Sequence, residues 1–576
     1  MEGEGSASVE RSVGRDKRWL CLLILCVSPF FIHLGANALW DESEPWSAEP
    51  PREMVESGNY LVPTYSDVPR FRKPPLTYWI IAPFYLLFGV NEFAARLPGA
   101  IAASLTVALT YLIGRNLANP QVALMAALIL ATTPRFFLFA RVYHMDTFLT
   151  LFVTAAIYFF LRARVTAKVW NSLLAYGMTA MAVLTKGIVG ALIPLAAMTP
   201  WGIRNRDLRR SLLSPFGLGL LVLLALPWYI LMYTKFGEEF LRVHFFLEHY
   251  QRAVSSRLGA KPITFLLKEL LIGLLPWSAF MLPATVFVLG RIREPLKTVS
   301  ERPLALLPVW WFGFVLAFFS LSSGKRELYL MPLYPAMALT LGEYFAEAPF
   351  MKRGAYRLVH QGLCLLLVCL VFGLGLVAWQ ILQPLEGSSG KAALAVGLCA
   401  LLAGALAWPL WTNRLDLTGP TLAGIVATLA WLVVLALPLV EQYRDVKPLA
   451  LEVSRQAGPS DLVGTYGMQK ASFQFYVGRR PFYACSEQEI QKILHGRRRV
   501  FLLAPADAFE SLRMQSDIPL EILARGRILS IVAKRWPRQG FTEVILAVSK
   551  PLDSGEWQAD PSRPYPSCAE VAEEHP

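Results

Sequence analysis

The chain is organised around a series of apolar runs, each close to the ~20 residues that an α-helix needs to cross a bilayer. Hydrophobic residues make up 55% of its 576 residues and charged residues only 17%, which is far from the balance of a soluble chain. We therefore predict an α-helical polytopic membrane protein with about thirteen transmembrane helices. The runs lie at about 19–39, 97–114, 121–140, 146–161, 170–184, 188–203, 212–233, 268–290, 304–322, 328–346, 358–382, 391–411 and 420–440.

The positive charges indicate how the chain is oriented. Arg11, Arg15, Lys17 and Arg18 precede the first run, and no small-residue cleavage site follows it. Such a flank is typical of the cytoplasmic side, so we expect a retained anchor with the N-terminus in the cytoplasm. The net charge of +13 does not point to nucleic acid, because the Lys and Arg residues form short clusters between apolar runs instead of lining one face.

One apolar run, Pro75–Val90, is ambiguous because only residues 91–96 separate it from the next run. If it does not cross, the positive clusters between later runs all fall inside; if it crosses, most of them fall outside. We therefore predict an interfacial or re-entrant helix at 75–90, within a first outer loop at 40–96. The clusters are Arg162/Arg164/Lys168, Arg204/Arg206/Arg209/Arg210, Arg291/Arg293/Lys297, Lys352/Arg353/Arg357 and Arg414.

Beyond the last run the sequence becomes less apolar. Strand-like segments and one helical segment predict a small α/β extracytoplasmic domain. The strand-like segments are 462–466, 473–477, 500–503, 528–533 and 544–548, and the helical one is 487–494. The expected organisation is a cytoplasmic segment at 1–18, a membrane domain at 19–440, the α/β domain at 441–550 and a disordered tail at 551–576.

The seven cysteines divide into two groups. Five lie within apolar runs, where cysteine acts as a small buried hydrophobe. Cys485 and Cys568 lie beyond the last run and could pair with each other.

On this topology the remaining charges fall on the outer face, many of them at the ends of spans. Desolvating charge at membrane level is costly, so their shared placement favours a common site. Loop solvation is the alternative for any single residue, and Asp146 could be only a helix N-cap. Lys186 could snorkel, and Glu248 and His249 could only keep an outer loop hydrated.

Several motifs match a known family in order and spacing. The most specific are Arg70–Trp79, which contains Lys73-Pro74-Pro75, and Ser323–Pro335. Together the motifs resemble the dolichyl-phosphomannose protein mannosyltransferase-like glycosyltransferases, and among them the bacterial lipid A aminoarabinose transferases. The resemblance covers about residues 19–345. The further matches are Pro45–Met54, Phe88–Pro98, Ala140-Arg141 with Asp146, Leu184–Gly187, Leu226–Tyr229, Glu248-His249 and Leu275–Ser278.

The resemblance implies an enzyme of the bacterial inner membrane that moves a sugar from a polyprenyl phosphate to an acceptor on the outer face. The departing phosphate gains negative charge and needs cations. A hydroxyl acceptor needs a carboxylate to take its proton. The implied donor-binding residues are Lys73, Lys325, Arg326 and Tyr329, the carboxylates are Asp41, Glu44 and Asp146, and further candidates are Arg72, Glu248, His249 and Arg252.

Two positions depart from the family pattern. Aligned on Arg52-Glu53-Met54, the family's first-loop aspartate falls on Ser43, so Asp41 or Glu44 would have to replace it. Arg72 stands where the branch usually places glutamate before Lys-Pro-Pro. These changes leave open a degenerate relative without activity.

The cofactor and the acceptor also stay open. No metal-site spacing is present, although His249 with neighbouring acids could ligate a divalent metal. The acceptor could be a lipid A-like lipid, an envelope glycan or a protein. A transporter or flippase is the alternative class, but it favours ionisable residues within the spans and two similar halves, and the sequence shows neither.

Overall fold

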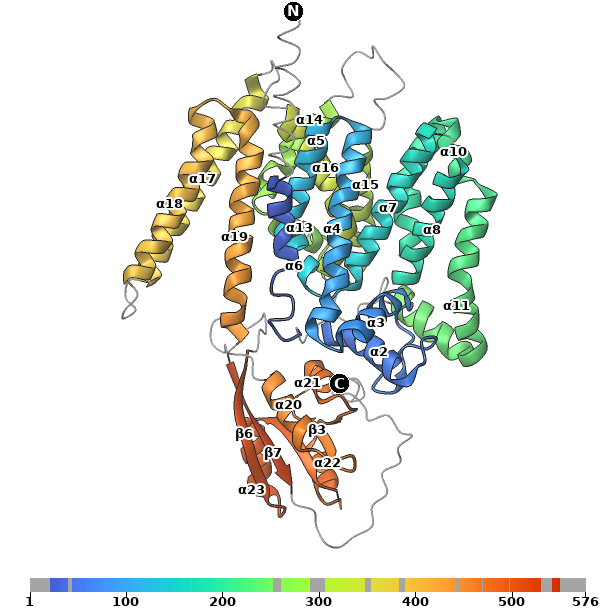
Figure 1. The fold of residues 1–576 in the computed structure, drawn as a ribbon, viewed down its shortest axis with the longest axis vertical. Helices are drawn as coiled ribbons and strands as arrows, with labels where there is room; N and C mark the ends of the chain where they lie inside the picture. Colours follow the sequence, from blue (N-terminus) through green and yellow to red (C-terminus); the bar gives the residue numbers. More distant parts are fainter. Residues whose placement is uncertain are drawn as a thin grey trace, which may run out of the picture. The chain divides into compact units, whose positions relative to one another are not determined.

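The helices of the chain follow the apolar runs, as its computed structural model shows (Figure 1). The structure describes residues 21–549 except for 40–43, 167, 252–260, 291–305, 348–353, 383–388, 442–445, 469, 497 and 530–540. The expected N-terminal segment at 1–18 and tail at 551–576 therefore lie outside the described residues, as does Cys568.

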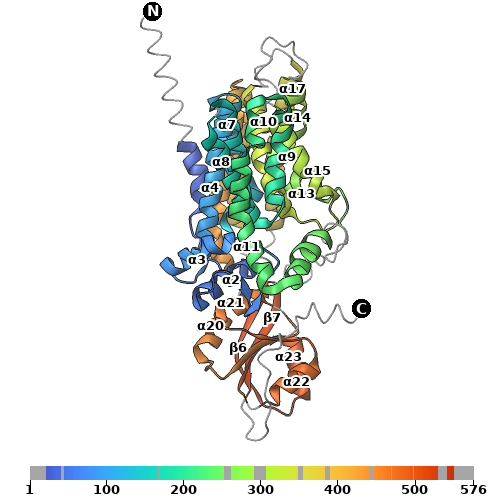
Figure 2. The ribbon, with the colours of Figure 1, turned by 90° about the vertical axis from the view of Figure 1, so that its right-hand side faces the viewer.

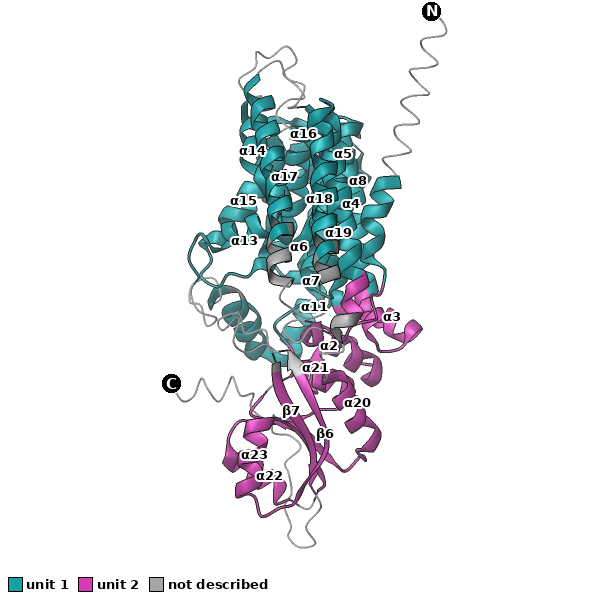
Figure 3. Ribbon diagram, turned by 90° about the vertical axis from the view of Figure 1, so that its left-hand side faces the viewer, with its two compact units in different colours: residues 1–32, 71–77, 97–434 teal, residues 33–70, 78–96, 435–576 magenta. Residues whose placement is uncertain are grey.

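The chain divides into two compact units (Figure 3). The first unit contains residues 1–32, 71–77 and 97–434, and the second contains residues 33–70, 78–96 and 435–576. The second unit thus combines most of the first outer loop with the C-terminal region. The domain boundaries expected from sequence, which keep these two regions apart, stay a prediction.

Helices of the first unit run side by side in two perpendicular views (Figures 1 and 2). Among the packed pairs are α7 with α8, α5 with α16, and α17 with α18. The helices from α4 to α19 are α4 (Glu92–Leu117), α5 (Pro120–Ala131), α6 (Pro134–Arg141), α7 (Met145–Thr166), α8 (Val169–Lys186), α9 (Val189–Arg204), α10 (Arg206–Leu212), α11 (Pro215–Leu241), η2 (Arg242–Gln251), α13 (Phe265–Gly273), η3 (Trp277–Phe280), α14 (Met281–Gly290), α15 (Leu307–Leu321), η6 (Glu327–Leu333), α16 (Tyr334–Glu347), α17 (Gly354–Leu382), α18 (Ser389–Trp411), η8 (Leu415–Leu417) and α19 (Thr418–Glu441).

The described residues contain five helices long and apolar enough to cross a membrane, or up to seven if each of two bent pairs counts as one span. Other runs expected to cross form shorter helices, such as α9 with 16 residues, α15 with 15 and α16 with 14. The fold is thus mostly helical with several apolar helices, and the count of about thirteen spans stays a prediction.

Two of the runs predicted to cross, 121–140 and 268–290, form bent helix pairs. Helices α5 and α6 meet at 63°, and α13 meets the helical segment 277–290 at 114°. A proline lies at each break, Pro134 after Thr133 and Pro276 after Leu275. Proline lacks the backbone N–H that continues a helix, and it disfavours helical geometry in the residue before it.

Helix α3 (Leu76–Phe88) occupies the run that the sequence left ambiguous. Its 13 residues extend about 20 Å, which is less than the ~30 Å hydrocarbon core. One face is buried through Tyr78, Ile81 and Tyr85, whereas Leu87 is 75% exposed. The helix therefore has a length and an apolar exposure that suit the interface predicted for 75–90.

A five-stranded mixed sheet forms the core of the C-terminal region, with strand order β4-β3-β5-β7-β6. Strands β4, β3 and β5 are parallel, and β7 is antiparallel to both β5 and β6. The elements are β3 (Leu462–Tyr466), β4 (Phe482–Ala484), β5 (Val500–Pro505), β6 (Leu520–Leu529), β7 (Phe541–Ser549), α20 (Val446–Gln456), α21 (Ala471–Val477), α22 (Glu487–Leu494) and α23 (Ala506–Gln515).

Both faces of this sheet are covered, because successive strand residues point to opposite sides. Phe501 and Leu503 belong to the apolar core that also contains α20 and α21 residues. Val500 and Leu502 belong to a second core with α22 and α23 residues. Two cores around one sheet explain why a short, apolar strand such as β5 is buried from Val500 to Ala504.

Most elements predicted for this region are confirmed, but one is wrong. The strand-like segments 462–466, 500–503 and 544–548 lie in β3, β5 and β7, and the helix at 487–494 matches α22. Of the predicted segment 528–533, residues 528 and 529 lie in β6, and residues 530–533 lie outside the described residues. The segment 473–477 forms helix α21 instead of a strand. Gly478 follows the helix with a φ of 72°, the left-handed conformation that often ends helices. The alternating apolar residues Phe473, Phe475 and Val477 favoured a strand over this helix-end signal.

Cys485 follows β4 and is disulfide-bonded. Because Cys568 lies outside the described residues, the pairing of the two stays a prediction.

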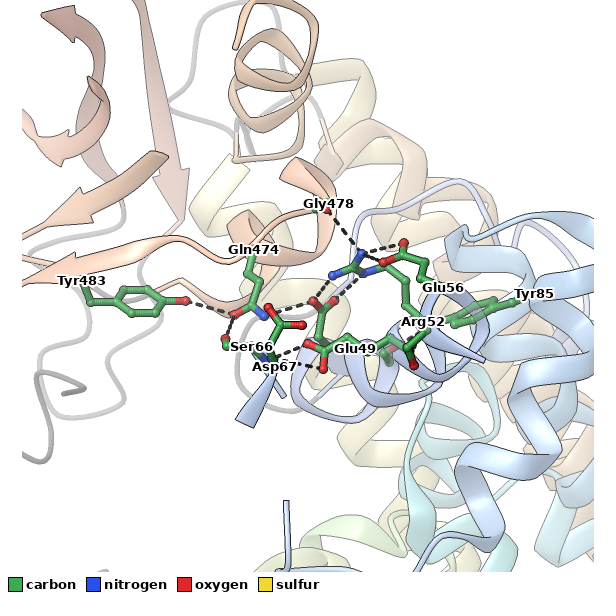
Figure 4. A network of polar contacts seen from close by, with 12 residues as sticks. Glu49, Arg52, Glu56, Ser66, Asp67, Tyr85, Gln474, Gly478 and Tyr483 are labelled. Atoms are coloured by element: carbon green, nitrogen blue, oxygen red, sulfur yellow. Dashed lines mark hydrogen bonds and ion pairs between the residues drawn. The ribbon is translucent and has the colours of Figure 1, made fainter. Parts of the chain in front are cut away.

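Polar side chains connect the first outer loop to α21 within the second unit (Figure 4). Helix α2 (Glu44–Ser57) carries Glu49, which is fully buried. Its carboxylate accepts hydrogen bonds from Arg52 Nε at 3.0 Å and from Gln474 Nε2 at 3.0 Å. Gln474 in turn accepts from the Ser66 hydroxyl at 2.9 Å. A buried carboxylate with such partners can be retained, whereas an unpaired one would be very costly.

Glu53 supports a tight turn in the same loop. Strands β1 (Thr64–Tyr65) and β2 (Val68–Pro69) are joined by Ser66 and Asp67, whose φ values of 55° and 61° are typical of a two-residue hairpin. The Glu53 carboxylate accepts from the Ser66 N–H at 2.6 Å and from the Asp67 N–H at 3.4 Å. Burial raises the pKa of Glu53 to about 7, and the charge of Glu49 adds to the effect.

This raised pKa predicts a pH dependence of stability. The folded state holds the Glu53 proton more tightly than the unfolded state between pH 4.5 and about 7, so stability should fall as the pH rises through this window. The expected loss is about 3 kcal/mol. In detergent, the apparent unfolding midpoint of Glu53→Gln should no longer decrease as the pH rises through this window. The midpoint of the control Glu521→Gln, at an exposed position, should decrease as that of wild type does. Parallel profiles for wild type and Glu53→Gln would contradict the assignment.

Candidate active site

Asp146 lies in the first turn of α7 and is almost fully buried. Its carboxylate forms an ion pair with Lys186 at the end of α8, and His144 Nδ1 lies 3.1 Å from its second oxygen. Capping of α7 is therefore not its main interaction. A buried carboxylate held by a cation is an arrangement that either supports the fold or serves chemistry.

Lys186 extends this cluster to Tyr329. The ammonium nitrogen lies 4.6 Å from the centroid of the Tyr329 ring, a cation–π distance. Tyr329 belongs to η6, is 8% exposed and packs on Phe319 with ring centroids 4.8 Å apart. Two residues that the sequence singled out, Asp146 and Tyr329, are thus brought together through Lys186.

Lys73 and Glu248 form a second ion pair in the first unit. Their side chains are 17% and 8% exposed. Glu248 lies on η2, so the structure joins two candidates that are 175 residues apart in the sequence. A carboxylate beside a lysine keeps the cation in place, and a phosphate that enters could replace it as the partner.

The segment that carries Lys73 is held against the same helical stretch. His244 on η2 is buried, and its Nδ1 lies 2.7 Å from the Phe71 carbonyl oxygen. The Phe71 ring packs on Phe236 and Phe240 with centroids 4.9 and 5.9 Å away. These contacts fix the backbone two residues before Lys73.

Lys325 is a buried cation with a different environment. The residue is 6% exposed, and its ammonium donates to the Lys261 carbonyl oxygen at 3.0 Å. Within the described part of the chain, no carboxylate pairs with it. A carbonyl offsets only part of the cost of burying an ammonium, so this position favours an anionic ligand.

Glu44 is held by an arginine in the second unit. It is fully buried, and Arg96 donates to its two oxygens at 2.8 and 2.6 Å. Arg96 also donates to the carbonyl oxygens of Leu34, Asn37 and Ala38 at 2.7 to 3.0 Å. A carboxylate bound in this way anchors the start of α2.

The remaining candidates are less informative. Arg72 and Arg326 are exposed. Asp41 and Arg252 lie outside the described residues, and the side chain of His249 on η2 is also not described. Among the residues that the structure describes, no group of three or more His, Cys, Asp or Glu side chains could hold a metal ion.

Three partners in these clusters were underrated or missed by sequence reasoning. Lys186 lies in the motif Leu184–Gly187, but a lysine at the end of a span is also explained by snorkelling. His144 and Arg96 were not candidates, and only their places beside Asp146 and within Phe88–Pro98 marked them. Ion pairs over such separations depend on how the helices pack.

Sequence comparisons agree with the motifs. A family model described as dolichyl-phosphate-mannose-protein mannosyltransferase matches residues 72–233. An undecaprenyl phosphate-alpha-4-amino-4-deoxy-L-arabinose arabinosyl transferase of Erwinia tasmaniensis is 31% identical over 405 residues, 66% of this chain and 71% of the relative. A second such transferase, from Pseudomonas fluorescens, is 30% identical over 379 residues, which cover 64% of this chain and 67% of the relative.

The fold is also similar to that of a solved structure. The crystal structure of ArnT from Cupriavidus metallidurans bound to undecaprenyl phosphate matches with a TM-score of 0.71 and 21% identity, over 92% of this chain and 98% of the other. Fold and sequence together define a multi-pass membrane glycosyltransferase. The chain belongs to the dolichyl-phosphate-mannose-protein mannosyltransferase-like family, close to the aminoarabinose transferases.

The buried pair of Asp146 and Lys186 gives a stability prediction. Lys186→Met should destabilise the protein by about 3–5 kcal/mol, because it leaves a buried carboxylate without its cation. Asp146→Asn/Lys186→Met should recover most of that loss in the apparent unfolding midpoint, measured in detergent. The control Arg210→Met removes an exposed pair with Asp207 and should change stability by less than about 1 kcal/mol. A Lys186→Met midpoint equal to that of wild type would contradict the assignment.

Proposed function

We propose that this glycosyltransferase moves a sugar from a polyprenyl-phosphate donor to an acceptor on the outer face of the bacterial inner membrane, with a lipid A-like lipid as the preferred acceptor. The buried Lys325, whose described partner is a carbonyl oxygen, is the observation that carries the proposal. Such a cation suits a donor phosphate. The names of the two arabinosyl transferases support undecaprenyl phosphate as the carrier and an aminopentose as the sugar.

In the proposed reaction an oxygen of the acceptor attacks the anomeric carbon of the sugar. The bond from that carbon to the phosphate oxygen breaks, and the electron pair leaves with the polyprenyl phosphate. Lys73 and Lys325 stabilise the negative charge that develops there, with Arg326, Arg252 and the Tyr329 ring as further donor contacts. Lys73 would exchange its Glu248 partner for the phosphate as the donor binds.

A hydroxyl acceptor must lose its proton, whereas a phosphate oxygen carries none to lose. We propose that Asp41 accepts this proton, because Arg96 already binds the Glu44 carboxylate. Asp146, neutralised by Lys186, would orient the donor-binding side chains instead of acting as the base. Arg72, placed where relatives of this branch have an acid, would meet an acceptor phosphate. Glu248 and His249 stay candidate ligands of a divalent metal.

The orientation that accompanies this proposal has the N-terminus in the cytoplasm and the 441–550 region outside, with about thirteen spans and α3 at the outer interface. A transporter or flippase is the alternative. It would move a lipid-linked sugar without consuming it, so release of free polyprenyl phosphate distinguishes the two functions.

Lys325 provides the test of donor recognition. Lys325→Gln should lower kcat/KM for undecaprenyl phosphate-aminoarabinose about 10- to 100-fold, since it replaces a charge-assisted contact by a neutral one. Transfer of radiolabelled sugar to lipid A measures the effect. The exposed Lys268→Gln should behave as wild type. An unchanged kcat/KM for Lys325→Gln would mean that the phosphate binds elsewhere.

Substitution of the two first-loop acids should have different effects, one on transfer activity and the other on stability. Asp41→Asn should reduce transfer to a hydroxyl acceptor by about 10²- to 10⁴-fold with an unchanged unfolding midpoint. Glu44→Gln should lower the midpoint, because breaking a buried ion pair costs about 3–5 kcal/mol. If Glu44→Gln keeps its stability and loses transfer, while Asp41→Asn retains activity, the assignment is reversed.

A further inference from the structure

Tyr476 from helix α21 binds the first outer loop directly. Its hydroxyl donates to Glu92 Oε1 at 2.8 Å and accepts the backbone N–H of Leu39 at 2.8 Å. Leu39 is fully buried and Glu92 is 5% exposed. One hydroxyl from the C-terminal region therefore links the chain before α2 to the first turn of α4.

Lys447 on α20 reinforces the same contact. Its ammonium forms an ion pair with Glu92 and lies 5.4 Å from the centroid of the Tyr476 ring. Helices α20 and α21 pack together. The buried Glu92 carboxylate is thus satisfied by two residues of the C-terminal region.

The other side of the same segment is held by Arg96, one helical turn after Glu92. As described above, its guanidinium binds Glu44 and three carbonyl oxygens between Leu34 and Ala38. The Asn37 side chain adds a hydrogen bond to the Leu437 carbonyl oxygen at 2.8 Å. The backbone at 34–39 and the start of α2 at Glu44 are therefore fixed by groups that lie far away in the sequence.

We propose that Tyr476 is a positioning residue for sugar transfer, so that the C-terminal domain sets the geometry of the first outer loop at Leu39 and Glu44. The inference rests on the proposed function, in which the first loop supplies a catalytic carboxylate. In this role Tyr476 acts through its hydrogen bonds with Glu92 and Leu39. A misplacement of about 1 Å in a reacting group can reduce a rate about 100-fold.

The test is Tyr476→Phe in the full-length protein, assayed with undecaprenyl phosphate-aminoarabinose and lipid A. Its kcat should fall about 10- to 100-fold, while KM for the donor stays within about twofold. The matched control is Tyr483→Phe. Tyr483 is also buried, but its hydroxyl hydrogen-bonds Gln474 of the same C-terminal region at 3.4 Å and no described residue among 34–39 and 44. The control should keep both constants and the same unfolding midpoint.

Each outcome decides the inference. A lowered kcat with a midpoint equal to that of Tyr483→Phe supports positioning. A lowered midpoint with an unchanged kcat per folded molecule, or equal kcat values for both variants, overturns it while the proposed function stands. If wild type transfers no sugar from the polyprenyl-phosphate donor, the proposed function is wrong, and so is this inference, which depends on it.

Discussion

The cost of removing charge from water is the constraint on which the rest of this structure depends. An isolated buried ion costs several kcal/mol, so each buried acid needs a cation or several hydrogen bonds. Asp146 with Lys186, Glu248 with Lys73, and Glu44 with Arg96 all meet this requirement. Lys325 meets it only through a carbonyl oxygen among the described residues, and for this reason we propose that it binds the donor phosphate.

The first turn of α4 contains two buried charged residues that also need partners, and these partners connect it to the first outer loop and the C-terminal region. Glu92 faces residues of the C-terminal region, and Arg96, one turn later, faces the segment that leads into α2. This explains why residues 33–70 and 78–96 form one compact unit with residues 435–576, although more than 300 residues separate 96 from 435. In the function that we propose, the C-terminal domain is then part of the catalytic framework.

Much of the fold was predictable because its signals are local. Apolar runs locate the helices, including α3 within 75–90, and strand-like segments locate β3, β5 and β7. The structure departs from the local signal in two ways, of which only the strand predicted at 473–477 is an error. Phe473, Phe475 and Val477 alternate like a strand but are buried in a short helix, and the runs at 121–140 and 268–290 bend at prolines that apolarity alone does not register.

The sequence by itself determined the class of protein, the family and most of the candidate residues, since composition and motif spacing are properties of the chain. Only the tertiary structure decided the partners: that Lys186 neutralises Asp146, that Arg96 occupies Glu44, and that Tyr476 contacts Leu39 and Glu92. An ion pair forms only when its two side chains lie within a few ångströms of each other. Separations of 40, 52 and 384 residues along the chain set no such distance until the helices have packed.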